Sequence, residues 1–191
     1  MSIMTPEIYW TIFPDWQTVS FLHIWMTGIM TSMNNKEQRS AYLTWPRKRI
    51  KFSSFLSNYK ESAWVSRKLF HKQANLWGIP IWQDVTSLRE AASATDSILY
   101  VTDTSKRHFA AGKECIIISE TDCMKFDVGT ISVLGADQIN LVGHVLNDWP
   151  SGSLIFPVLP AMIDAEQKTQ MITAAVGVIT IDAKEQFTTE E

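Results

Sequence analysis

The chain has 191 residues, of which 46% are hydrophobic and 19% charged, and its 17 basic and 20 acidic side chains give a net charge of -3. This composition is typical of one globular core with room for a smaller inserted module, and it excludes a disordered chain. The slight negative charge argues against nucleic-acid wrapping and against adhesion to anionic lipid.

The first apolar stretch, at 8–14, is short and lacks the basic region and the cleavage site of a secretory signal. No window of the sequence approaches the roughly 18 uninterrupted apolar residues that cross a bilayer. We therefore expect neither a signal peptide nor a contact with a membrane.

Residues 1–20 carry Pro6 and Pro14 among large aromatic side chains. Proline opposes both a long helix and a central strand, so this segment is predicted to be an extended N-terminal arm. Large rings are favoured where surfaces are buried between subunits. We expect the arm to pack on a neighbouring chain through Tyr9, Trp10, Phe13 and Trp16.

The next segment is predicted to be a β-hairpin. Apolar and β-branched residues at 19–32 favour a strand, Asn34-Asn35-Lys36 is typical of a turn because Asn tolerates positive φ, and a second strand follows at 37–45. After Pro46, basic and apolar residues alternate, which predicts a strand with one basic face. The basic positions are Arg47, Arg49 and Lys51, and the apolar positions are Ile50 and Phe52.

The basic run at 47–51 lies beside Trp45, and clustered Lys and Arg can contact phosphates. Four charges on one strand more often form a solvated edge or pair with carboxylates of a neighbouring subunit. We therefore expect no nucleic-acid partner.

A helix is predicted over 60–77. Asn58 precedes Glu61 by three residues, which is an Asn-led form of the capping box that starts helices. Apolar residues then recur at helical spacing until Gly78, a residue that commonly ends helices.

Short β runs separated by turn residues follow the helix and predict a small antiparallel barrel or sandwich. These runs lie at 79–82, 97–102, 114–119, 126–134, 138–142 and 153–158. A last strand is expected at 176–181, after a polar stretch at 164–173 with helical character.

The predicted fold is mainly β (α+β), with a β-sandwich or split-barrel outer domain that has one helix and carries an inserted small antiparallel β-barrel module. We assign residues 1–20 to the arm, 21–85 plus 156–183 to the outer domain, 86–155 to the inserted module and 184–191 to a flexible tail.

The sequence offers little catalytic chemistry. The four histidines are scattered singly, the aspartates lie beside predicted turns, and the glycines do not form a phosphate loop. We therefore nominate no catalytic residue, metal site or cofactor. Cys115 and Cys123 cannot supply a disulfide framework, and whether they pair with each other is left open.

Two motifs, Glu37-Gln38-Arg39 and Pro46-Arg47-Lys48-Arg49, stand at the spacing of one hairpin. In this respect the chain resembles phage tail proteins of the distal-tail and baseplate-proximal type. The likeness continues through Ile79-Pro80-Ile81-Trp82 and Trp149-Pro150-Ser151-Gly152 and covers about 20–182. It departs from the family at Lys48, where the family more often has Arg, and in the aromatic arm.

The resemblance implies a non-enzymatic structural protein of the virion, assembled in the host cytoplasm without a cofactor. It implies a ring of three-fold or six-fold symmetry at the tail tip or baseplate, which joins the tail tube to the central hub. The implied partners are copies of the chain itself and the tail tube and hub proteins. The alternatives are a head–tail connector or tail-completion ring, and a tail-associated cell-wall hydrolase, which needs paired acids, a Cys–His pair or a zinc site.

The hairpin charges are candidates for the contact between subunits. Glu37 and Arg39 share a strand face, and Arg47 and Arg49 extend that face across the hairpin. Such charges specify register between identical subunits more than they add affinity. An equally weighted alternative is that Glu37 and Arg39 satisfy each other within one monomer.

Overall fold

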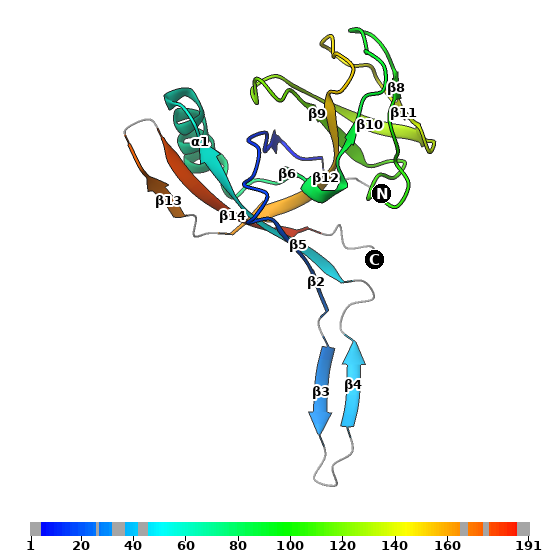
Figure 1. Cartoon of the computed structure of the whole chain (residues 1–191). Coiled ribbons are helices and arrows are strands. Elements are labelled where there is room, and N and C mark those ends of the chain that lie inside the picture. Colours follow the sequence, from blue (N-terminus) through cyan, green and yellow to red (C-terminus); the bar gives the residue numbers. More distant parts are fainter. Residues whose placement is uncertain are drawn as a thin grey trace.

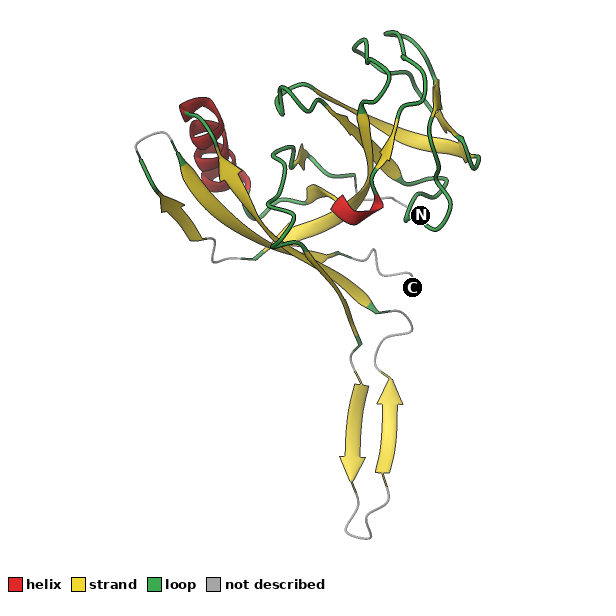
Figure 2. Cartoon of the chain, in the orientation of Figure 1, coloured by secondary structure: helices red, strands yellow, loops and turns green. Residues whose placement is uncertain are grey.

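A computed structural model describes residues 5–25, 27–31, 37–41, 46–164, 168–173 and 176–186. The described chain is mainly β with one α-helix, which confirms the predicted fold class (Figure 2). The helix α1 spans Tyr59–Lys72, and a short 3-10 helix, η1, spans Trp82–Asp84.

The strands belong to an outer sheet, a projecting hairpin and a module (Figure 1). The strands of the outer sheet are β1 (Ile8–Tyr9), β2 (Ser20–Ile24), β5 (Arg47–Leu56), β6 (Trp77–Pro80), β12 (Leu154–Ile163), β13 (Lys168–Met171) and β14 (Gly177–Glu185). The hairpin consists of β3 (Thr27–Thr31) and β4 (Glu37–Ala41). The module contains β7 (Thr86–Ser87), β8 (Ile98–Tyr100), β9 (Glu114–Ile118), β10 (Phe126–Leu134) and β11 (Gln138–Leu141).

The strand β5 organises the outer sheet. It pairs antiparallel with β14 from Leu56↔Gly177 to Arg49↔Lys184, and with β2 on its other side. Ile50 and Phe52 are fully buried whereas Lys51 is exposed, so the predicted strand with one basic face is confirmed. The helix α1 packs its Val65 side on the core face of this sheet.

The start of α1 is as predicted. Asn58 Oδ1 accepts a hydrogen bond from the Glu61 backbone N–H at 2.9 Å, and the Glu61 carboxylate accepts one from the Ser57 N–H at 2.7 Å. The predicted end is wrong, because the helix ends at Lys72. Trp77 is instead the first residue of β6 and is fully buried between β1 and β12. The prediction of helical character at 164–173 is also wrong, because β13 forms there and pairs with β14.

The module closes into a small barrel. Its strands pair in the order β12, β9, β10, β11 and β8. Residues 86–89 complete the ring: the Leu88 N–H donates to the Ser153 carbonyl at 2.9 Å, and the Arg89 N–H donates to the Tyr100 carbonyl at 2.8 Å. One short segment therefore joins β12 to β8.

Two hydrophobic cores follow from this arrangement. The first lies under the outer sheet, and the second fills the barrel with side chains drawn from 88–155, near the predicted limits of the module. The strands β9 and β12 contribute to both, since Ile116 and Phe156 face the first core while Ile117 and Ile155 face the second. Two shared strands therefore join the module to the outer sheet.

The N-terminal segment is part of the fold of its own chain. The strand β1 pairs parallel with β6, and Tyr9 lies against Gly78, where an added Cβ would stand 2.3 Å from the Tyr9 ring. Trp10 follows with no exposed surface, and its ring centroid lies 5.9 Å from that of Phe52. The prediction that a neighbouring chain must bury the arm is therefore wrong for Trp10. The reason is that the first core already contains the space that the ring fills.

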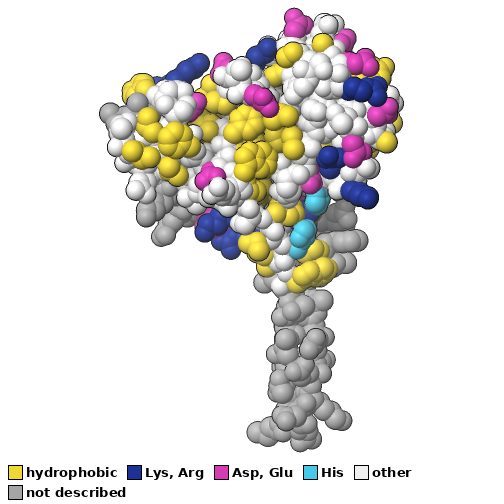
Figure 3. Space-filling model, in the orientation of Figure 1, with side chains coloured by type: hydrophobic (Ala, Val, Ile, Leu, Met, Phe, Trp, Pro, Cys, Tyr) yellow, Lys and Arg dark blue, Asp and Glu magenta, His cyan; other side chains and the backbone are white. Residues whose placement is uncertain are grey.

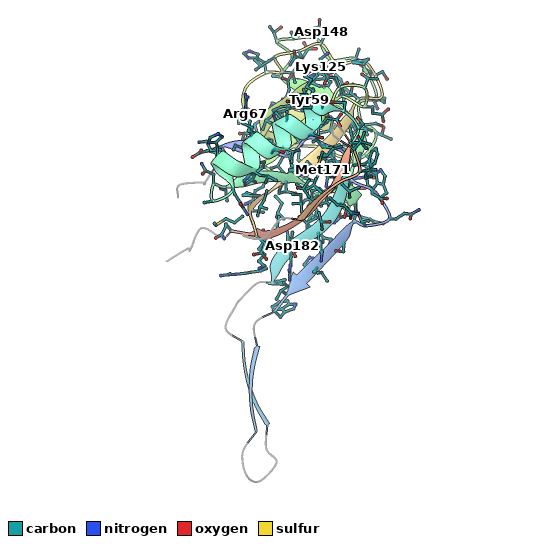
Figure 4. All side chains as sticks on the ribbon, turned by 90° about the vertical axis from the view of Figure 1, so that its left-hand side faces the viewer. Tyr59, Arg67, Lys125, Asp148, Met171 and Asp182 are labelled. Atoms are coloured by element: carbon teal, nitrogen blue, oxygen red, sulfur yellow. The ribbon has the colours of Figure 1, made fainter. Side chains whose placement is uncertain are left out.

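The predicted hairpin is confirmed in β3 and β4, which pair antiparallel from Thr27↔Ala41 to Thr31↔Glu37. Its predicted turn, Asn34-Asn35-Lys36, lies outside the described residues. The strand expected over 19–32 contains two strands, because β2 pairs with β5 whereas β3 pairs with β4. Figures 1 and 4 show β3 and β4 leading away from the rest of the molecule.

Candidate functional site

An apolar surface lies where the hairpin leaves the outer sheet. We call it the hairpin base and define it as Leu22, Ile24 and Trp25, whose exposed fractions are 47%, 37% and 55%. Figure 3 shows apolar side chains at this end of the molecule. The strand β2 is an edge of the sheet, and exposed apolar residues on an edge strand favour association unless something covers them.

Arginine side chains of β5 share a face with Leu22 and Ile24 of the hairpin base. Leu22 is paired with Arg49 and Ile24 with Arg47, and directly opposed residues of antiparallel strands point to the same face. The base therefore combines apolar and basic groups, a composition common at the centres and rims of protein interfaces.

Arg49 has an acidic partner in its own chain. Its Nε donates to Asp182 Oδ1 at 2.6 Å, and its second guanidinium nitrogen donates to Asp182 Oδ2. The hydrogen bonds to Asp182, followed by the charge of that carboxylate, raise the pKa of Arg49. A contact of Arg49 with a second subunit stays a prediction.

The other hairpin charges are placed less fully. The Arg47 side chain is exposed at the last register pair of β2 and β5. Glu37 is in register with Thr31 and Arg39 with Ile29, but the side chains of Glu37 and Arg39 lie outside the described part of the structure. Both interpretations of these two charges, between subunits and within one, stay open.

The four aromatic residues of the N-terminal segment have separate surroundings. Tyr9 is half-buried and donates from its hydroxyl to Glu114 Oε2 at 3.0 Å, and burial raises the pKa of both groups. The ring of Phe13 packs against Trp82 in the first core, to which the buried Trp10 also belongs. Trp16 is 53% exposed, so among the four it is the side chain most available to another molecule.

Sequence reasoning missed a contact that holds β2 against the module. The Asp84 carboxylate accepts hydrogen bonds from the backbone N–H of His108, at 2.8 Å, and from its ring Nδ1. The Phe21 ring of β2 packs on His108, with 5.5 Å between centroids. Asp84 ends the short helix η1, and His108 lies in a loop 24 positions later, so no periodic pattern indicates that they meet.

Other chemical groups are placed as follows. Cys115 is buried and Cys123 half-buried, and both are free thiols, which answers the question of their pairing. Within the described ranges, no three His, Cys, Asp or Glu side chains are grouped to hold a metal ion. No helix in that part of the chain has the length and apolar character to span a membrane.

No protein-family model matches the chain, and no curated protein matches its sequence. The motifs of the hairpin and the geometry of its base are therefore the grounds on which a function is argued.

Proposed function

We propose that the chain is a non-enzymatic structural protein of a phage tail. Copies of it form a ring at the tail tip or baseplate that joins the tail tube to the central hub. One structural observation carries the proposal. Among the described residues, β3 and β4 pair with each other and with no other strand, and they lead away from the body (Figures 1 and 4).

A projecting hairpin of this kind needs a second surface. An isolated pair of strands is marginally stable in water and gains stability from a third strand or from packing on another element. Among the described residues, the outer sheet and the module pair with neither β3 nor β4. A neighbouring copy supplies such a surface, and a head-to-tail contact that repeats by rotation closes into a ring.

The hairpin base supports the same proposal. Leu22, Ile24 and Trp25 remain exposed in the single chain, at the point from which the hairpin starts. Burying them against a neighbour removes the association hazard of an apolar edge strand. Aromatic and arginine side chains are enriched in such contacts, and the base contains Trp25, which follows Ile24, the register partner of Arg47.

Native mass spectrometry of the purified full chain, with negative-stain electron microscopy, tests the proposal. We expect closed oligomers of three-fold or six-fold symmetry. A variant in which residues 26–45 are replaced by a two-residue Asn-Gly turn should remain monomeric with a melting temperature close to that of the full chain. If this variant still forms the same oligomers, the hairpin does not hold the ring together.

Three pairs of substitutions, one of them a control, locate the contact. Leu22→Ser with Trp25→Ser should weaken the ring, whereas the matched control Val142→Ser with Leu146→Ser, also at exposed apolar residues, should leave it unchanged. Equal loss in both variants would indicate nonspecific association. Arg39→Ala with Arg47→Ala tests the charged motif: assembly should fail while the free energy of unfolding changes by less than about 1 kcal/mol.

A further inference from the structure

A polar pocket of about 420 Å³ opens on the outside of the barrel. It lies beside β8, at the end of the molecule away from the hairpin (Figure 1). Pockets of this size are typical of sites for small ligands. The side chains that give it its chemical character are Glu90, Thr95, Asp96, Ser97, Ile98 and Tyr100.

Tyr100 provides an aromatic surface in this pocket. Leu99 and Val101 fill the barrel core, so Ile98 and Tyr100 alternate to the outside, where the Tyr100 side chain stays 40% exposed. The Arg89 guanidinium carbon lies 5.9 Å from the centre of the Tyr100 ring and holds the ring by a cation–π contact. An exposed, fixed ring is a surface on which the apolar face of a sugar ring can stack.

Hydrogen-bond acceptors surround this ring. Glu90 and Asp96 contribute carboxylates. One carboxylate oxygen of Asp96 accepts a hydrogen bond from the Ser93 backbone N–H at 2.8 Å. Ionised carboxylates accept hydrogen bonds, and the hydroxyl groups of a ligand can donate them.

The wall of the pocket is held in a strained conformation. Thr95 has a φ of +88°, which is unusual for a β-branched residue. Two backbone hydrogen bonds keep it there: the Thr95 N–H donates to the Val145 carbonyl at 2.9 Å, and the Val145 N–H donates to the Asp96 carbonyl at 3.0 Å. Strain that the surrounding structure maintains is concentrated at ligand sites.

We propose that this pocket binds a neutral saccharide, which stacks on Tyr100 and donates hydroxyl hydrogen bonds to Glu90 and Asp96. The two carboxylates disfavour binding of an anionic ligand by charge repulsion, and Arg89 likewise disfavours a cation. The polar lining disfavours a purely apolar ligand, because such a ligand would desolvate polar groups without replacing their hydrogen bonds. This site goes beyond ring assembly, because it adds recognition of a glycan by a surface separate from the hairpin.

The full-length protein is screened on an array of neutral and sialylated oligosaccharides, and the strongest neutral glycan is then titrated by calorimetry. Tyr100→Ala should weaken its binding by about tenfold, whereas Tyr100→Phe, which keeps the ring, should bind as the parent does. Asp96→Asn should also weaken binding, because a neutral amide is a poorer acceptor than a carboxylate. Tyr59→Ala, at an exposed tyrosine of α1, is the matched control (Figure 4).

Three results overturn the proposal: no neutral glycan on the array is bound, sialylated glycans alone are bound, or Tyr100→Ala binds as tightly as the parent. Native mass spectra of the same Tyr100→Ala protein separate this outcome from ring assembly, which the substitution should leave intact.

Discussion

Arg49 and Asp182 form a two-bond ion pair across the neighbouring strands β5 and β14. On the other side of β5, Arg49 is paired in register with Leu22 of the hairpin base. Paired hydrogen bonds between a guanidinium and a carboxylate restrict the orientation of both groups. The pair therefore fixes the part of the sheet from which the hairpin projects, and Asp182 marks that part in Figure 4.

A double-mutant cycle with Arg49→Ala and Asp182→Ala should give a coupling of about 1 kcal/mol in the free energy of unfolding, measured with urea. The side chains are 32% and 16% exposed, so solvent screens the pair only in part. The control is Lys72 and Glu7, which are 46% and 60% exposed and should couple more weakly because solvent screens them. Equal couplings would show that the two-bond geometry adds nothing.

Trp10 and Trp16 should respond in opposite ways to truncation. Trp10→Ala removes a fully buried ring and should lower the free energy of unfolding by about 3–5 kcal/mol. Trp16→Ala removes an exposed ring and should change it by less than about 0.5 kcal/mol. Chemical denaturation of the two variants measures both changes in the free energy of unfolding. Similar losses would mean that the N-terminal segment packs differently from the structure described above.

The Trp10 result also marks what the sequence can predict. Alternation identified the buried side of β5 at Ile50 and Phe52, and the Asn58 cap identified the start of α1, because both are local patterns. The burial of Trp10 depends on the pairing of β1 with β6, which lie almost 70 positions apart. Local patterns do not contain that pairing.

The candidate sites also differ in how far local sequence patterns predict them. Sequence motifs indicated the hairpin and its charges, whereas the exposure of Trp25 depends on which strand is the sheet edge. The barrel pocket was not predicted, since it needs the closure of residues 86–89 between β12 and β8. Tyr100 alone, in a short β run, looks like any strand residue.

Replacing Thr95 by Gly should stabilise the protein by about 1 kcal/mol, because Gly adopts positive φ without the steric cost that Thr carries there. Thermal and urea unfolding measure the change. Thr169→Gly, at an exposed position of β13, is the control and should destabilise by about 0.5–1 kcal/mol. A loss of stability in Thr95→Gly would show that its side chain contributes more than the strain costs.

Stability should fall in alkaline solution because of Cys115. Burial raises the pKa of this thiol from 9.0 to about 12, so the folded state keeps a proton that the unfolded state releases. Its contribution is complete below pH 9 and is lost as the pH rises toward 12, with a slope of at most about 1.4 kcal/mol per pH unit. Unfolding free energies measured from about pH 8 to pH 10.5 should decline less steeply in Cys115→Ala than in the parent.

Cys123→Ala is the comparison for this experiment. Its half-buried thiol has a pKa raised to about 11, so its removal should change the slope less than the removal of Cys115. An unchanged alkaline slope in Cys115→Ala would mean that this thiol is in contact with solvent.

Locating the chain in a virion tests the central claim most directly. The proposed function implies that the genome encoding the chain produces tailed particles. These particles are purified and imaged by electron cryomicroscopy, and their proteins are identified by mass spectrometry. We predict one closed ring of copies between the tail tube and the hub, with the β3–β4 hairpin of each copy resting on the next. Absence of the chain from the particles, or its presence only at the head–tail junction, would contradict this account.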